Sequence, residues 1–145
     1  MFSSDPVVSV KDVSIFQDRH TVLTNVNFEI DKGEFVFLVG RTGSGKSSLL
    51  KTLYADLPLR VGDVQISGFN VRGLKSSEVP MLRRKLGIIF QDFQLFNDRT
   101  VDENLMFVLK ATGWTDNAKM RARVSDVLMR VGLGSVEKKM PHQLS

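Results

Sequence analysis

Residues 40–47 match the pattern G-x-x-x-x-G-K-[ST] of a phosphate-binding P-loop, with the sequence Gly-Arg-Thr-Gly-Ser-Gly-Lys-Ser. This pattern predicts a site for a nucleoside triphosphate with Mg²⁺. The three glycines let the backbone wrap tightly, so that its N–H groups surround an anion at the start of the following helix. We expect Lys46 to reach the β- and γ-phosphates and the Ser47 hydroxyl to ligate Mg²⁺.

The other residues of the loop are expected to act through their backbone N–H groups, so their side chains can vary. The sequence therefore gives no side-chain role to Arg41. The predicted nucleotide-binding residues of this segment are Gly40, Arg41, Thr42, Gly43, Ser44, Gly45, Lys46, Ser47 and Ser48. The alternative interpretation is a plain glycine-rich turn without a ligand.

The segments around the loop favour the P-loop interpretation. Phe35–Val39 is a short, continuous apolar run, which is typical of a strand buried on both faces. Residues 47–55 can continue as a helix. Together they predict the order strand, glycine loop, helix that the motif requires.

The remaining pattern is β-rich before the loop and helical at the end of the chain. Alternating apolar residues predict strands over residues 7–16 and 22–30, which open the chain as an antiparallel pair. A short strand is expected over 63–67, a helix capped by Ser77 and ending at Arg84, and a buried strand over 86–90. Helices are predicted over 101–111 and 116–131, the second with a core stripe of Val124, Val127, Leu128 and Val131.

The composition is that of one soluble α/β domain: 145 residues, 42% hydrophobic and 25% charged. The chain has no cysteine, which excludes disulfides and cysteine zinc sites. We expect no membrane span and no secretory signal. The net charge of +4 is interpreted as solvated basic helix faces, with an anionic membrane surface or an acidic partner as the alternative. Nucleic acid is disfavoured because no recognition motif accompanies the basic residues.

Three further features accompany the P-loop: Gln91 directly after the strand expected over 86–90, Phe16 at the end of the first strand, and the closing sequence Pro-His-Gln-Leu-Ser. Together they resemble the nucleotide-binding domain of ABC-type ATPases. The resemblance implies that Gln91 senses Mg²⁺ and the γ-phosphate, and that Phe16 stacks on adenine. Such stacking contributes about 1 kcal/mol to the binding free energy. The family more often has tyrosine at that position. Phe16 is alternatively a core aromatic, and Gln91 a polar residue that merely ends a strand.

The implied fold is α/β, a P-loop NTPase of ABC type. It has an N-terminal antiparallel β segment, a P-loop core and a helical subdomain. Residues 1–145 are expected to form one incomplete domain, with an ATP-binding core over about 1–90 and the helical subdomain over 91–145. The resemblance also implies ATP and Mg²⁺ as cofactors, with Ser47 and Gln91 as metal-binding residues. It implies a homodimer in the full-length family.

Within this family, residues 78–92 and the following Asp98-Arg-Thr-Val101 and Asn104 look most like the FtsE group of cell-division ATPases. That group works with a membrane protein of FtsX type to control cell-wall hydrolysis. The likeness implies a cytoplasmic protein held at the inner membrane through its partner. Lipoprotein-release and macrolide-export ATPases share much of the same stretch, so an exporter ATPase remains an alternative.

The chain departs from the family pattern after Leu144-Ser145, which resemble the first two residues of the family signature. No Walker B aspartate and glutamate, dimer-contact aspartate loop or switch histidine is found; His20 and His142 lie in other contexts. We therefore expect a fragment of a longer product that binds ATP with little or no turnover. In the family the Walker B strand flanks the P-loop strand, so residues 35–39 are expected to be an unpaired, aggregation-prone edge.

Overall fold

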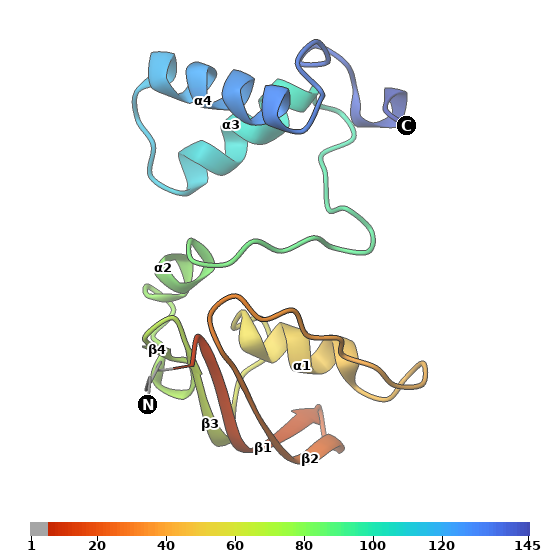
Figure 1. Cartoon of the computed structure of the whole chain (residues 1–145), viewed down its shortest axis with the longest axis vertical. Helices are drawn as coiled ribbons and strands as arrows, with labels where there is room; N and C mark the ends of the chain where they lie inside the picture. Colours follow the sequence, from red (N-terminus) through yellow and green to blue (C-terminus); the bar gives the residue numbers. More distant parts are fainter. Residues whose placement is uncertain (1–5) are drawn as a thin grey trace. The chain divides into compact units, whose positions relative to one another are not determined.

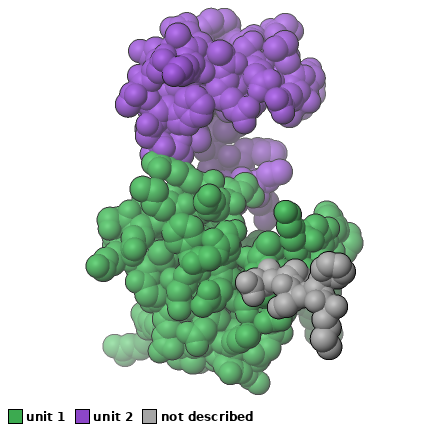
Figure 2. Space-filling model, turned by 60° about the vertical axis from the view of Figure 1, so that its left-hand side comes forward, with its two compact units in different colours: residues 1–87 green, residues 88–145 purple. Residues whose placement is uncertain are grey.

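The computed structural model describes residues 6–145, in two compact units that meet in sequence between Gly87 and Ile88 (Figure 2). We call residues 6–87 the sheet unit and residues 88–145 the helical unit. Residues 1–5 lie outside the described residues. The prediction that the N-terminus carries no secretory signal falls partly on them. In the described part of the chain, no helix is long and apolar enough to cross a membrane.

The sheet unit is built on four antiparallel strands in the order β2-β1-β3-β4 (Figure 1). The strands are β1 (Val8–Gln17), β2 (His20–Ile30), β3 (Val61–Ile66) and β4 (Phe69–Asn70). Apolar residues of β1 and β3, among them Val10, Val13 and Val64, are almost completely buried. The antiparallel β segment predicted at the start of the chain is therefore confirmed.

Helix α1 (Lys46–Leu53) follows the P-loop and packs into the core of the sheet unit. Leu49 is only 3% exposed and belongs to the same buried cluster as Val10 and Val13. Thr52 is fully buried, and its hydroxyl donates to the carbonyl oxygen of Ser48 at 2.9 Å. The helix predicted after the loop is confirmed, although it ends at Leu53 rather than Ala55.

A short helical segment closes the sheet unit. It consists of η1 (Val71–Gly73) and α2 (Val79–Arg83). The prediction that Ser77 caps the second helix is wrong, because the cap residue is Glu78. The Glu78 carboxylate turns back and accepts a hydrogen bond from the backbone N–H of Lys75 at 2.9 Å. Leu82 of α2 is fully buried.

Two predicted buried strands are not strands in the structure. Residues 35–39 form no ladder, and Phe35 and Val39 are each 83% exposed. Residues 86–90 also form no ladder, and Ile89 is 93% exposed. Both segments are apolar, but a strand also needs a neighbouring strand to accept and donate its backbone hydrogen bonds. Among residues 6–145, the four strands of this sheet pair with one another and with no further strand.

The helical unit contains α3 (Val101–Ala111), α4 (Asn117–Arg130) and η2 (Pro141–Gln143). The predicted bounds of α3 are confirmed, and those of α4 are confirmed to within one residue at each end. Asp116 caps α4 by accepting from the N–H groups of Ala118 and Lys119. Val124 and Leu128 are buried against Val101 and Val136. Val131 is 68% exposed, so its predicted place in the core stripe is wrong, because the helix has ended one residue earlier.

Candidate nucleotide-binding site

The P-loop is a tight turn that leads directly into α1. The N–H of Ser44 donates to the carbonyl oxygen of Arg41 at 3.1 Å, and the N–H of Leu49 begins the helix by donating to Gly45 at 2.9 Å. Gly43 and Gly45 have φ angles of +80° and +94°, a left-handed conformation that costs a residue with a Cβ about 1–2 kcal/mol. A Cβ on Gly45 would also lie 2.8 Å from Val22 Cγ1.

The N-terminus of α1 has free donors. Its cap residue is Gly45, which supplies no side-chain acceptor. Among residues 6–145, no acceptor is found for the backbone N–H groups of Lys46, Ser47 and Ser48. The start of a helix also carries about half a positive charge. The N–H groups and the helix dipole at this end of α1 favour an anion, and the phosphate of a nucleotide stays a prediction for this position.

Lys46 lies over the loop. Its Nζ donates to the carbonyl oxygens of Gly40 at 2.7 Å and Arg41 at 2.8 Å. An ammonium group has three N–H donors, so one remains for a phosphate oxygen. The neighbouring Ser47 is exposed, and in the described residues no cluster of histidine, cysteine, aspartate and glutamate is suited to hold a metal. The binding of Mg²⁺ by the Ser47 hydroxyl stays a prediction.

Phe16 lies on the strand next to the one that the P-loop contacts. It is half-buried and pairs with Thr21 of β2, and the adjacent Ile15 pairs with Leu23. Gly45 lies against Val22 and Leu23. The sheet unit therefore brings the predicted adenine contact and the predicted phosphate loop to neighbouring parts of β1 and β2.

Gln91 belongs to the helical unit, whereas the P-loop belongs to the sheet unit. It is an exposed residue at the start of a turn that includes Phe93 and Gln94, both with positive φ. Its contact with nucleotide and Mg²⁺ stays a prediction. A hollow of about 520 Å³ in the sheet unit is lined by Phe69, Glu78, Met81, Arg84 and Lys85, and none of these is a residue of the loop.

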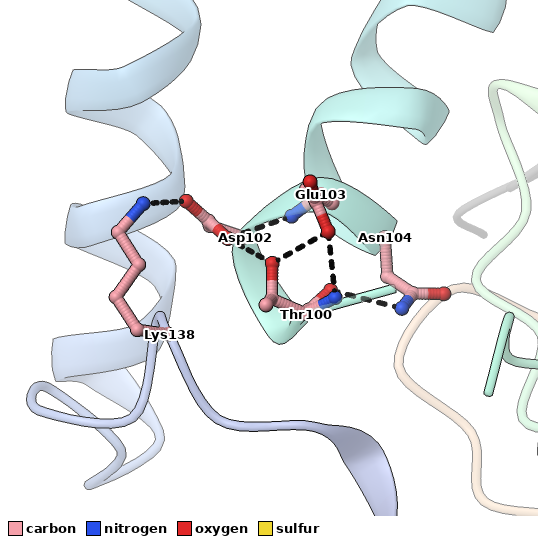
Figure 3. Close-up of polar contacts among 5 residues, drawn as sticks. All are labelled: Thr100, Asp102, Glu103, Asn104 and Lys138. Carbon is pink, nitrogen blue, oxygen red and sulfur yellow. Dashed lines mark hydrogen bonds and ion pairs between the residues drawn. The ribbon is translucent and has the colours of Figure 1, made fainter. Parts of the chain in front are cut away.

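A polar network around the first turn of α3 is not among the predicted site residues. The Thr100 N–H donates to Glu103 Oε2 at 2.8 Å, and Lys138 Nζ donates to Asp102 Oδ2 at 2.7 Å (Figure 3). Burial alone would raise the pKa of Asp102, but hydrogen bonds from Lys138 and Thr100 hold that pKa below its ordinary value. The signal in the sequence was Thr-x-x-Glu over residues 100–103, the pattern of a capping box.

The comparisons with known proteins agree with this loop and fold. Residues 23–145 match the ABC transporter family. The cell division ATP-binding protein FtsE of Mycobacterium tuberculosis is 43% identical over 123 residues, which cover 85% of this chain and 53% of that protein. The methionine import ATP-binding protein MetN of Nocardia farcinica is 36% identical over 147 residues, which cover 99% of this chain and 44% of that protein.

Among solved structures, the dimeric ATP-binding cassette MJ0796, in a post-hydrolysis state bound to ADP and Pi, matches with a TM-score of 0.81 at 30% identity. The match covers 95% of this chain and 63% of that one. The chain thus spans about half the length of the curated relatives that it matches. On the strength of the family match over residues 23–145, this chain belongs to the ABC transporter family, and its fold is that of an ATP-binding cassette over the part that it covers.

Proposed function

We propose that this chain binds ATP with Mg²⁺ through residues 40–48. The observation that carries the proposal is the open N-terminus of α1 behind a left-handed glycine loop. Backbone N–H groups and the helix dipole would bind the phosphate oxygens, and the remaining donor of Lys46 would neutralise their charge. The Ser47 hydroxyl would ligate Mg²⁺, and Phe16 would stack on the adenine ring.

Hydrolysis makes further demands. Transfer of the γ-phosphoryl group to water requires an oriented water molecule and a protein carboxylate that holds Mg²⁺ or activates the water. The sequence offers Gln91 as the contact to Mg²⁺ and the γ-phosphate, but no residue that matches the Walker B carboxylates. We therefore propose that residues 1–145 bind ATP with little or no turnover.

For the biological role, we propose that the chain belongs to a cell-division ATPase. This ATPase would work with a membrane partner of FtsX type at the cytoplasmic face of the membrane. The 43% identity to FtsE supports it. The second candidate is the ATPase of a transport system, whether an importer or an exporter of lipid, lipoprotein or drug. The 36% identity to MetN favours that candidate. The MJ0796 structure is dimeric, which supports a homodimer for the whole domain.

Binding is tested by titrating the purified chain with a fluorescent ATP analogue in the presence of Mg²⁺. We expect Lys46→Ala to weaken binding about 10- to 100-fold, because a hydrogen bond to a charged group contributes about 1.5–3 kcal/mol. Lys51→Ala is the matched control: it removes the same charge from the last turn of the same helix. Equal affinity of the wild type and Lys46→Ala would contradict the proposal.

The metal and the partner need separate measurements. Ser47→Ala should weaken binding in Mg²⁺ but change little in EDTA, because only the metal contact depends on the hydroxyl.

Phosphate release measured on the same samples separates binding from turnover. Clear turnover that disappears in Lys46→Ala would refute the claim of little turnover. Co-expression with FtsX-type and methionine-permease-type membrane proteins, followed by affinity purification, distinguishes the two candidate roles.

A further inference from the structure

The first turn of α3 is held by a segment from the far end of the helical unit. The N–H of Val101 donates to the carbonyl oxygen of Lys139 at 2.9 Å, and the N–H of Asp102 donates to that of Glu137 at 3.0 Å. Between these two acceptors in sequence, Lys138 reaches Asp102 with its side chain, across 36 residues of the chain (Figure 3). Three contacts thus fasten residues 137–139 to two residues of α3.

This arrangement meets the need of a helix N-terminus for acceptors. The first four N–H groups of a helix have no partner within it. In α3, Val101 and Asp102 use the distant carbonyls, and the N–H of Glu103 uses Asp102 Oδ1 at 2.9 Å. The helix dipole favours carbonyl and carboxylate oxygens here but disfavours a bare ammonium group. Asp102 lies between Lys138 and the helix end, and so makes the position of Lys138 favourable.

The same turn also holds the segment that precedes α3. Asn104 is 7% exposed, and its Oδ1 accepts from the N–H of Phe96 at 2.8 Å. Its Nδ2 donates to the carbonyl oxygens of Phe96 at 3.1 Å and Arg99 at 3.2 Å. Residues 96–100 are therefore fixed to α3 by one buried amide, next to the attachment of residues 137–139.

The attached segment leads to the end of the described chain. Val136 is buried with Val101, and Leu144 packs against the same cluster. Between them, the N–H of Met140 donates to Gln143 Oε1 at 2.8 Å, and the N–H of Leu144 donates to Pro141 at 3.1 Å. This chain of contacts connects residues 137–139 to Leu144.

We infer that Lys138 is a positioning residue. Through Asp102 it fixes residues 137–139 on the first turn of α3, and it thereby couples the Leu144-Ser145 segment to the segment around Phe96. Its importance for an ATPase rests on the proposed function, in which Leu144-Ser145 begin the family signature. The contacts of residues 137–139 with α3 need no nucleotide, so the experiment is done without ATP. Its result would therefore stand even if the chain failed to bind ATP.

The test is backbone amide hydrogen exchange, followed by NMR on the 145-residue chain. Lys138→Met should accelerate exchange at Val101 and Asp102 about 2- to 5-fold, the range expected for loss of a partly exposed ion pair. Lys139→Met is the matched control: it removes the same charge from the adjacent exposed residue, whose carbonyl is kept. Lys138→Arg should restore slow exchange, and the amide of Leu128, inside α4, reports global unfolding.

The coupling adds a readout that a purely local contact would not change. In Lys138→Met, but not in Lys139→Met, the amide of Phe96 should also exchange faster and the amide resonance of Leu144 should shift. Equal exchange in the two methionine variants would overturn the role of Lys138. Acceleration confined to Val101 and Asp102 would overturn the coupling to Phe96 and Leu144.

Discussion

Lys46 Nζ donates to the carbonyl oxygen of Gly40 at 2.7 Å, so the cation expected to meet phosphate also closes the P-loop on itself. The loop is held from the other side by β2, because Gly45 lies against Val22 and Leu23. The loop geometry therefore depends on the antiparallel sheet, whose four described strands all lie in the sheet unit.

Gly45→Ala should destabilise the sheet unit by about 2 kcal/mol. The substitution places a Cβ at a φ of +94° and 2.8 Å from Val22 Cγ1. Urea unfolding followed by circular dichroism measures the change. Gly73→Ala is the control, because a Cβ there meets nothing within 4 Å and the φ angle is not positive. A loss in Gly45→Ala no larger than in Gly73→Ala would contradict this account of the loop.

Arg83→Met should cost about 1 kcal/mol of stability, because it removes the tie between α2 and the end of α1. Arg83 Nε donates to the carbonyl oxygen of Tyr54 at 3.0 Å, and Nη2 donates to that of Ala55 at 3.2 Å. The guanidinium is partly exposed, which keeps the effect modest. Thermal unfolding compares it with Arg84→Met, whose guanidinium donates to Met81 Sδ at 3.3 Å, within the region of α2 itself. Equal melting temperatures would rule out the tie.

The stability of the helical unit should fall in acid through Asp102. Its pKa lies below the ordinary value of 3.8: burial raises it, but the hydrogen bonds from Lys138 and Thr100 outweigh that effect. A carboxyl group with a lowered folded-state pKa stabilises the fold above its unfolded-state pKa, and this contribution is lost as the pH falls through the folded-state pKa. The contribution is therefore present at pH 7 and declines below about pH 4.

Asp102→Asn tests this assignment. The variant should be less stable than the wild type at pH 7, and its stability should fall less steeply below about pH 4. Glu103 also has a lowered pKa, owing to hydrogen bonds from the backbone and side chain of Thr100, so some acid sensitivity should persist. Denaturant unfolding at several pH values measures both effects. An unchanged pH profile in Asp102→Asn would show that the Lys138 contact contributes nothing.

Phe37→Glu should reduce self-association of the purified chain. Phe37 is 78% exposed in the apolar segment 35–39, and its ring packs edge-on against Phe35 with centroids 5.0 Å apart. Exposed apolar segments without strand partners favour intermolecular pairing. Light scattering should fall while circular dichroism stays unchanged, because the substitution removes little buried area. Light scattering equal to that of the wild type would place the association elsewhere.

The sequence predicts features that depend on neighbouring residues better than features that depend on contacts between distant residues. The P-loop and the helix over 101–111 depend on neighbouring residues, such as Gly45 before Lys46 and the capping pair Thr100 and Glu103. The segment 35–39 shows the limit: its apolar pattern is that of a buried strand, but burial needs a partner strand that no local pattern supplies. The contact between Asp102 and Lys138 was missed for the same reason, since it joins distant residues.

The central claim is that the start of α1 binds phosphate, and backbone amide NMR during titration with ATP and Mg²⁺ tests it most directly. We predict large shifts at residues 43–48, within which the helix-starting N–H groups of residues 46–48 have no acceptor in the described chain. Val101 and Asp102, which start α3 but already donate to Lys139 and Glu137, should shift little. Shifts of equal size at both helix starts, or none at residues 43–48, would contradict the account.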